Sequence, residues 1–208
     1  MKNYIVEFIG TFFLVLVIGL CVIAPGAGNM APLAIGGVLM VMIYAGGPIS
    51  GAHYNPAITI AIWLRGKCPA KDIPGYIIAQ LAGAFLAALT VKMFKGSSLV
   101  TAAELNLSLA LIAEFLFTFA LAFVILNVAT TKKAEGNSYF GLAIGFTVMA
   151  GAYAVGGISG GVFNPAVAAG ITIMGLSAVS NIWIFLVANF GGAIAAALVF
   201  KLVNPEEA

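Results

Sequence analysis

The sequence predicts an all-α membrane protein with six transmembrane helices and two re-entrant half-helices, arranged as an inverted internal repeat. Three observations predict this fold: the composition, six long apolar runs and a duplicated motif. Of the 208 residues, 62% are hydrophobic and 8% are charged, whereas soluble chains are about half apolar and a quarter charged. The net charge is only +2 and the basic residues form no cluster, which excludes intrinsic disorder and a nucleic-acid partner.

Six apolar runs are long enough to cross a bilayer, because a spanning helix needs about 20 residues. The predicted spans are residues 4–24, 31–47, 73–91, 105–128, 139–155 and 182–200. The second and fifth only just reach the required length. The first is too long for the apolar part of a signal peptide and contains no cleavage site, so we expect it to remain as a span. Because the runs do not alternate, they do not predict a membrane β-barrel.

Two further apolar runs, residues 55–64 and 164–175, are too short to span a bilayer. Each begins with Asn-Pro, and proline in the first turn of a helix costs no hydrogen bond because its missing N–H would have no partner there. We therefore expect two half-helices that enter the membrane without crossing it.

The basic residues predict the orientation of the chain. With the N-terminus inside and six crossings, seven of the nine basic residues lie on the inner side, and only Lys92 and Lys95 lie outside. The positive-inside rule favours this arrangement over its inverse. We expect a multi-pass protein of the cell membrane, with both termini in the cytoplasm.

The two halves of the chain are related in sequence. Residues 46–57 align with residues 155–166 at an offset of 109, with seven of twelve positions identical, and the same offset aligns 78–92 with 187–201. Each half contains three crossings, so the second half lies upside down relative to the first. We predict a first repeat over residues 1–100 and a second over 101–208, which together form a single pore-forming domain.

Short, proline-interrupted segments at matching positions of inverted halves mark a permeation site. We expect the half-helix N-termini to meet near the midplane, where their free N–H groups and partial positive charge repel cations and protons but admit neutral dipolar molecules. The side-chain amides add further donors. The predicted motif residues are Asn55, Pro56, Ala57, Asn164, Pro165 and Ala166.

The loops before the two motifs are expected to line the pore with backbone carbonyls, because non-helical backbone at membrane depth is tolerated only beside a water-filled cavity. The predicted lining residues are Gly51, Ala52, His53, Tyr54, Gly160, Val162 and Phe163. The single histidine cannot form a metal site alone, and it either braces its loop or gates the pore by titrating near neutral pH. We expect no catalytic residue, no metal site and no cofactor.

Glu7 and Glu114 lie inside predicted spans near the start of each half, at an offset of 107. An ionised group in a span is expensive and is usually functional or paired. One interpretation is a proton relay or a coupling-ion site. The favoured interpretation is structural, with each carboxylate accepting hydrogen bonds from the backbone of a re-entrant loop, because the two acids occupy matching positions in the repeat.

The twin Asn-Pro-Ala motifs and the paired glutamates resemble those of the aquaporin (major intrinsic protein) family, and the likeness covers the whole chain. The resemblance implies a passive channel for water and small neutral solutes, with one pore per subunit of a homotetramer in the lipid bilayer. It also implies that the chain is not an enzyme. By resemblance, the selectivity constriction falls on Ile35, Ala152, Gly161 and Val167.

One departure from the family pattern bears on the solute. Most members have arginine after the second motif, where this chain has Val167. The resemblance then implies a wider, apolar constriction that admits ammonia, hydrogen peroxide, urea or glycerol, although an apolar ring can also dewet and slow water. Two other classes stay in view: an ion-coupled secondary transporter, which would need charges at the central site, and a membrane scaffold, for which the loops are short.

Overall fold

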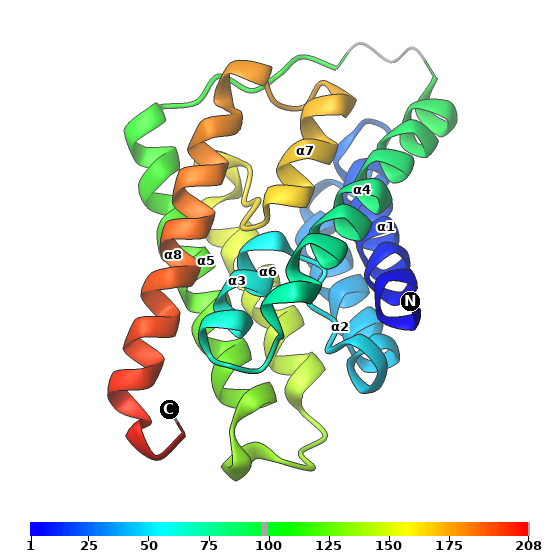
Figure 1. Cartoon of the computed structure of the whole chain (residues 1–208). Coiled ribbons are helices and arrows are strands. Elements are labelled where there is room, and N and C mark those ends of the chain that lie inside the picture. The colour runs from blue at the N-terminus through cyan, green and yellow to red at the C-terminus, as the bar shows by residue number, and fades with distance from the viewer. Residues whose placement is uncertain (97–99, 208) are drawn as a thin grey trace.

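The computed structural model describes residues 1–96 and 100–207. Within these residues the secondary structure is entirely helical (Figure 1). The α-helices are α1 (Lys2–Val22), α2 (Ala31–Ser50), α3 (Pro56–Leu64), α4 (Ile73–Lys95), α5 (Leu107–Thr130), α6 (Phe140–Ser159), α7 (Pro165–Met174) and α8 (Ile182–Val203). Short 3-10 turns are η1 (Gly28–Met30), η2 (Ala70–Asp72), η3 (Lys132–Ala134), η4 (Val179–Asn181) and η5 (Pro205–Glu207).

Among the described residues, six helices are long and apolar enough to span a membrane, which confirms the predicted fold class. They are α1, α2, α4, α5, α6 and α8, with 20 to 24 residues each. The two short helices α3 and α7 correspond to the predicted half-helices and lie between the long ones, with α7 above α3 in Figure 1.

Four spans, α2, α4, α6 and α8, are longer than the apolar runs predict, and the difference matters most for α2 and α6, whose predicted runs were only just long enough. Helix α2 continues to Ser50 and α6 to Ser159, and each ends at a glycine in the left-handed conformation, with φ of 86° at Gly51 and 94° at Gly160. A left-handed glycine after the last turn is a common way to end a helix. Pro48 lies inside the last turns of α2 without ending it. Both helices therefore reach 20 residues, enough to cross the bilayer.

Both halves pack their long helices at glycine crossing points. Helix α1 packs along α4, and α5 packs along α8. A Cβ atom on Gly83 of α4 would lie 2.5 Å from the carbonyl oxygen of Phe8, and one on Gly192 of α8 would lie 2.4 Å from that of Phe115. Small residues let helix backbones approach closely in lipid, where packing replaces the hydrophobic effect.

The two halves meet at the crossing of α2 with α6. A Cβ atom on Gly36 would lie 2.6 Å from the carbonyl oxygen of Gly145, and one on Gly145 would lie 2.5 Å from that of Gly36. This reciprocity is what a two-fold axis between inverted halves produces. The repeat boundary between residues 100 and 101 stays a prediction, and residues 97–99 and 208 of the two predicted repeats lie outside the described residues.

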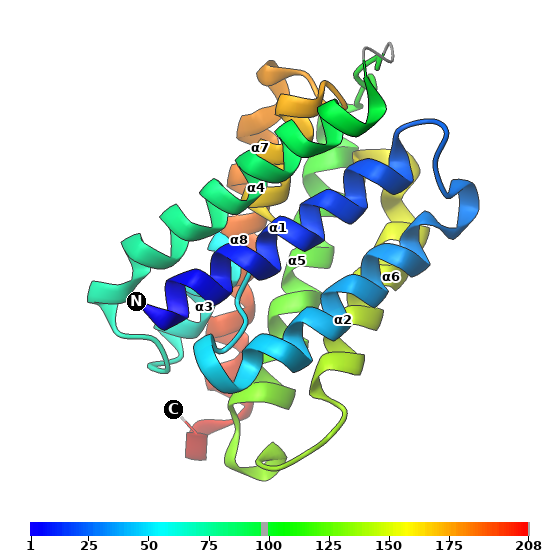
Figure 2. The same ribbon diagram turned by 90° about the vertical axis from the view of Figure 1, so that its right-hand side faces the viewer.

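The molecule has two distinguishable sides. Both termini, η2 and η3 lie on one side, which we call the terminus side, in the lower half of Figure 2. The α1–α2 and α7–α8 loops lie on the opposite side. Helix α3 runs from the centre toward the terminus side and α7 runs from the centre toward the opposite side, so their N-termini face each other (Figure 1).

Candidate functional site

The two half-helices begin with the same cap. Asn55 Oδ1 accepts hydrogen bonds from the main-chain N–H groups of Ala57 and Ile58, at 2.9 and 3.4 Å. Asn164 Oδ1 makes the same two bonds, at the same distances, with its own half-helix. Because the proline that follows each asparagine has no N–H, the cap takes up the first-turn donors. The N–H groups that we expected to be free at these N-termini are therefore largely satisfied.

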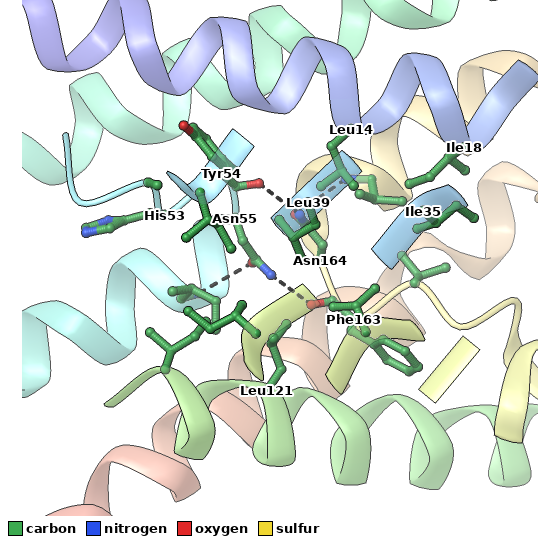
Figure 3. Close-up of a pocket in the computed structure, with 18 of the residues that line it drawn as sticks. Leu14, Ile18, Ile35, Leu39, His53, Tyr54, Asn55, Leu121, Phe163 and Asn164 are labelled. Atoms are coloured by element: carbon green, nitrogen blue, oxygen red, sulfur yellow. Dashed lines mark hydrogen bonds between the residues drawn. The ribbon is translucent and has the colours of Figure 1, made fainter. Parts of the chain in front are cut away.

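The caps also orient the side-chain amides. With Oδ1 held by the half-helix, Asn55 Nδ2 donates to the carbonyl oxygen of Phe163 at 2.8 Å, and Asn164 Nδ2 donates to that of Tyr54 at 2.9 Å (Figure 3). Each amide has two N–H groups. Within the described part of the chain one of them is used in this cross-bond, which leaves the second N–H of each asparagine without a protein acceptor.

The loops that carry the motifs are held in an unusual backbone conformation. Ala52, Tyr54 and Phe163 have left-handed φ angles of 51°, 48° and 50°. Such a conformation costs about 1–3 kcal/mol at a non-glycine residue and persists only where the surroundings enforce it. These residues therefore need strong support from the rest of the fold.

The buried glutamates supply this support. Glu7 accepts hydrogen bonds from Ser50 Oγ at 2.7 Å, from His53 N at 2.9 Å, from Tyr54 N at 2.7 Å and from Gln80 Nε2 at 2.8 Å. Its side chain is fully buried. The carboxylate points at the loop backbone and does not line the narrow cavity described below.

Glu114 repeats this arrangement in the second half. It accepts from Ser159 Oγ at 2.7 Å, from Val162 N at 2.8 Å, from Phe163 N at 2.7 Å and from Asn189 Nδ2 at 2.9 Å. It is also fully buried. Both acids thus accept hydrogen bonds from the backbone of a re-entrant loop, as the structural interpretation expects.

The side chains of Tyr54 and Phe163 are anchored on the long helices. The hydroxyl group of Tyr54 donates to Met42 O at 2.9 Å. The Tyr54 ring packs against Gly10, because a Cβ atom on Gly10 would lie only 2.1 Å from a ring carbon. Phe163 stacks on Phe117, with ring centroids 5.5 Å apart. These contacts fasten the two loops to the long helices.

A narrow cavity passes between the half-helix N-termini. Its volume is about 30 Å³, and one water needs about 10–15 Å³ by this measure, so about two or three waters fit in file. His53 lies toward one end of it, Ile18 and Ile35 lie toward the other, and the two asparagines lie between (Figure 3). The lining is aliphatic apart from His53, the asparagine amides and the loop backbone.

Most aliphatic lining residues were not predicted. They are Leu14, Ile18, Leu39, Ile43, Ile58, Leu121, Ile125, Ile144 and Val148. The repeat offsets of 107 and 109 relate most of them to each other or to predicted residues: Leu14 to Leu121, Ile18 to Ile125, Leu39 to Val148, Ile35 to Ile144 and Ile58 to Val167. A uniformly apolar span, however, has no polar face to indicate which side lines the pore.

Three of the four predicted constriction residues, Ile35, Gly161 and Val167, line the narrow cavity. Ala152 does not line it, and its Cα would lie 3.2 Å from a Cβ atom built on Gly161. Of the predicted loop residues, the narrow cavity is lined by Ala52, His53, Tyr54, Val162 and Phe163. Gly51 lines a wider cavity described next, and Gly160 lines neither. The motif residues Pro56, Ala57, Pro165 and Ala166 are buried within the half-helices.

On the terminus side, the narrow cavity meets a vestibule of about 960 Å³. Polar and charged residues of the terminus-side loops, such as Lys67, Asp72 and Asn137, line this vestibule. Five residues line both cavities and therefore mark their junction: Ile43, Ala52, His53, Ile125 and Ile144.

The sequence and the fold are similar to those of known proteins. Residues 1–200 match the family model described as major intrinsic protein. The chain is 38% identical to glycerol uptake facilitator protein-like 6 of Lactiplantibacillus plantarum, over the full length of both chains. It is 34% identical to aquaporin NIP1-1 of Zea mays, over 98% of this chain and 75% of that protein. Its fold is similar to the X-ray structure of the aquaglyceroporin from Plasmodium falciparum, with a TM-score of 0.83, 25% identity and coverage of 99% of this chain and 98% of that one.

Proposed function

The chain belongs to the major intrinsic protein family, and from this premise and the geometry of the narrow cavity we infer how it conducts. It is a passive transmembrane channel for water and small solutes such as glycerol, and not an enzyme. The observation that carries the proposed mechanism is the pair of asparagine amides, each with one N–H left for a passing molecule, between two half-helix N-termini that face each other.

The half-helices and the cavity lining favour neutral molecules. Each half-helix places about half a positive charge at its N-terminus, and these charges act strongly in a medium of low dielectric constant. Cations and protons are repelled there, while the oxygen of a neutral molecule can accept a hydrogen bond from Asn55 or Asn164. The residues that line the narrow cavity include no Asp, Glu, Lys or Arg. An ion-coupled transporter would normally bind its ion with such groups, so the passive channel is favoured.

We propose that the solute range extends to ammonia, hydrogen peroxide, urea and glycerol. Two predicted constriction residues have little or no side chain, Ala152 and Gly161, and the other two, Ile35 and Val167, are aliphatic. Val167 is only 3% exposed and holds the place where most of the family has arginine. Without a guanidinium group, that end of the pore has fewer donors and more room.

The test is Val167→Arg in proteoliposomes, with osmotic swelling measured under water and solute gradients. We expect glycerol and urea permeability to fall by about tenfold, which corresponds to about 1.4 kcal/mol of added barrier, while water flux persists. The control is Val179→Arg, because Val179 lies in η4 on the opposite side and is 73% exposed. A wild-type channel that rejects every solute larger than water would contradict the proposed range.

We also propose that the channel is a homotetramer in the cell membrane with cytoplasmic termini. The distribution of basic residues supports the orientation, and the family resemblance supports the assembly. A protease-sensitive tag after Ala208 should be cleaved only when the cytoplasmic face is accessible. Cross-linking in native membranes should yield a four-subunit species, and a species no larger than a monomer would contradict the assembly.

A further inference from the structure

We propose that size selection in this channel is set by a ring on the terminus side rather than by the constriction on the opposite side. The terminus-side ring consists of the five residues shared by the narrow cavity and the vestibule: Ile43, Ala52, His53, Ile125 and Ile144. This inference rests on the proposed channel function and names the residues that limit the solute.

The first argument is location. The ring lies where a vestibule of about 960 Å³ meets a cavity of about 30 Å³, so every molecule that enters from the terminus side must lose most of its surrounding water there. Its three isoleucines come from three different long helices: Ile43 from α2, Ile125 from α5 and Ile144 from α6. All three side chains are more than 90% buried. The ring is therefore formed by well-packed side chains.

The second argument compares the ring with its own inverted copy. The repeat offsets of 107 and 109 convert the terminus-side ring into an opposite-side ring: Ile43 becomes Ala152, Ala52 becomes Gly161, His53 becomes Val162, Ile125 becomes Ile18 and Ile144 becomes Ile35. The positions of Ile125 and Ile144 are isoleucine in both rings. At Ile43 and Ala52 the terminus-side ring has the bulkier residue, and at His53 it has an imidazole where the opposite-side ring has the isopropyl group of Val162.

The structure shows how the smaller residues act on the opposite side. Gly161 has a left-handed φ of 64°, and a Cβ atom there would lie 3.2 Å from the Cα of Ala152. Ala152 does not line the narrow cavity, whereas its counterpart Ile43 does. Inversion gives both rings a similar backbone frame, so from the additional side-chain atoms we infer that the terminus-side ring is the narrower one.

His53 gives the terminus-side ring one polar member. Its Nδ1 lies 3.2 Å from Thr59 Oγ1, and its ring centroid lies 4.8 Å from that of Tyr76. These contacts hold the imidazole in place. A passing molecule meets four aliphatic side chains and one imidazole, which suits a small molecule with a single polar face. Among the proposed solutes, ammonia and hydrogen peroxide fit this ring better than urea and glycerol.

The test removes side-chain bulk from the terminus-side ring. Ile43→Ala gives the terminus-side ring the residue of its counterpart, and we expect the ratio of glycerol to water permeability in proteoliposomes to rise by about tenfold, as for a pocket that loses several methylene-sized groups. The matched control is Ile49→Ala, on the same helix but 44% exposed, which should leave the ratio unchanged.

The outcomes separate this inference from the proposed function. If neither the wild type nor any variant exceeds protein-free vesicles, the channel function itself fails. If water and solute flux are present, but Ile43→Ala leaves the ratio of glycerol to water permeability unchanged, the terminus-side ring does not select for size and the ring proposal is overturned. Should Ile43→Ala fail to fold, Ile144→Val removes one carbon atom from the same ring and must shift the ratio in the same direction.

Discussion

At the residue scale, the two buried glutamates explain how the strained loops before the two half-helices persist. An ionised carboxylate only accepts hydrogen bonds, and each of these carboxylates receives four, two of them from loop N–H groups. The bonds fix the loop backbone at Tyr54 and Phe163, whose carbonyl oxygens then accept the cross-bonds from the motif asparagines. The acids thus position the pore without entering it.

Glu114→Gln should destabilise the protein more than it changes its transport. The new amide NH₂ group faces donors instead of accepting from them, which leaves at least one buried N–H of Val162 or Phe163 unpaired, at a cost of about 1–3 kcal/mol. We expect a lower Tm in detergent and a lower folded yield. The control Glu104→Gln changes an exposed acid and should have no such effect. A normally folded Glu114→Gln protein that had lost an ion-coupled uptake would favour the relay interpretation instead.

At the element scale, glycine sets how closely the long helices pack. Gly83 and Gly192 occupy matching positions at the α1–α4 and α5–α8 crossings, where the neighbouring backbone carbonyl leaves no room for a Cβ atom. Backbone cannot move aside as a side-chain tip can. The two crossings hold α1 and α5, which themselves contribute Leu14 and Leu121 to the lining of the narrow cavity.

Gly192→Ala should therefore lower stability although alanine is the better helix former. Its Cβ atom would lie 2.4 Å from Phe115 O, and overpacking of this kind costs about 1–3 kcal/mol. The neighbouring Gly191→Ala is a matched control, since its Cβ atom would meet only the Phe115 ring at 3.4 Å. Thermal unfolding in detergent should show a lower Tm for Gly192→Ala only. Equal Tm values would mean that the crossing relaxes freely.

At the scale of the whole molecule, the C-terminal turn joins parts that are distant in the chain. Arg65, which follows half-helix α3, pairs with Glu207 of η5 at 2.9 Å, and their side chains are only 5% and 4% exposed. Glu207 also accepts from Lys132 N at 2.7 Å. The Arg65 guanidinium lies 5.0 Å from the centroid of the Phe200 ring. The half-helix, the α5–α6 connection and the end of α8 are thus held together on the terminus side.

Glu207→Ala should weaken this junction strongly, because removal of one partner from a buried ion pair leaves an uncompensated charge and costs about 3–5 kcal/mol. We expect a clear drop in Tm and faster proteolysis near residues 131–139. Glu206→Ala is the control: its pair with Lys133 is solvent-exposed, with 74% and 51% exposed side chains, and such pairs contribute about 0–1 kcal/mol. If the double variant Arg65→Met/Glu207→Leu were no more stable than Glu207→Ala, the buried charge would not be the cause.

Much of the fold could be predicted from local sequence. The six apolar runs, the two Asn-Pro starts and the duplicated motif predicted the spans, the half-helices and their inversion. The ends of α2 and α6 were predicted too early, because Pro48 and the Gly-Gly pairs resemble helix stops until the left-handed Gly51 and Gly160 are seen. The expectation of free half-helix N–H groups was wrong because it overlooked the asparagines as N-caps: asparagine is a preferred N-cap residue, and its side-chain oxygen takes up first-turn donors.

By itself, then, the sequence determined that this chain crosses a membrane six times and brings two inverted half-helices together, since run length and motif duplication are properties of short segments. Only the tertiary structure decided which aliphatic faces line the pore, that each asparagine bonds the carbonyl of the other loop, and which five residues form the terminus-side ring. The reason is physical. A helix that is apolar all round carries no mark of its pore-facing side, and partners more than 100 residues apart, such as Asn55 and Phe163, are chosen by packing rather than by sequence neighbours.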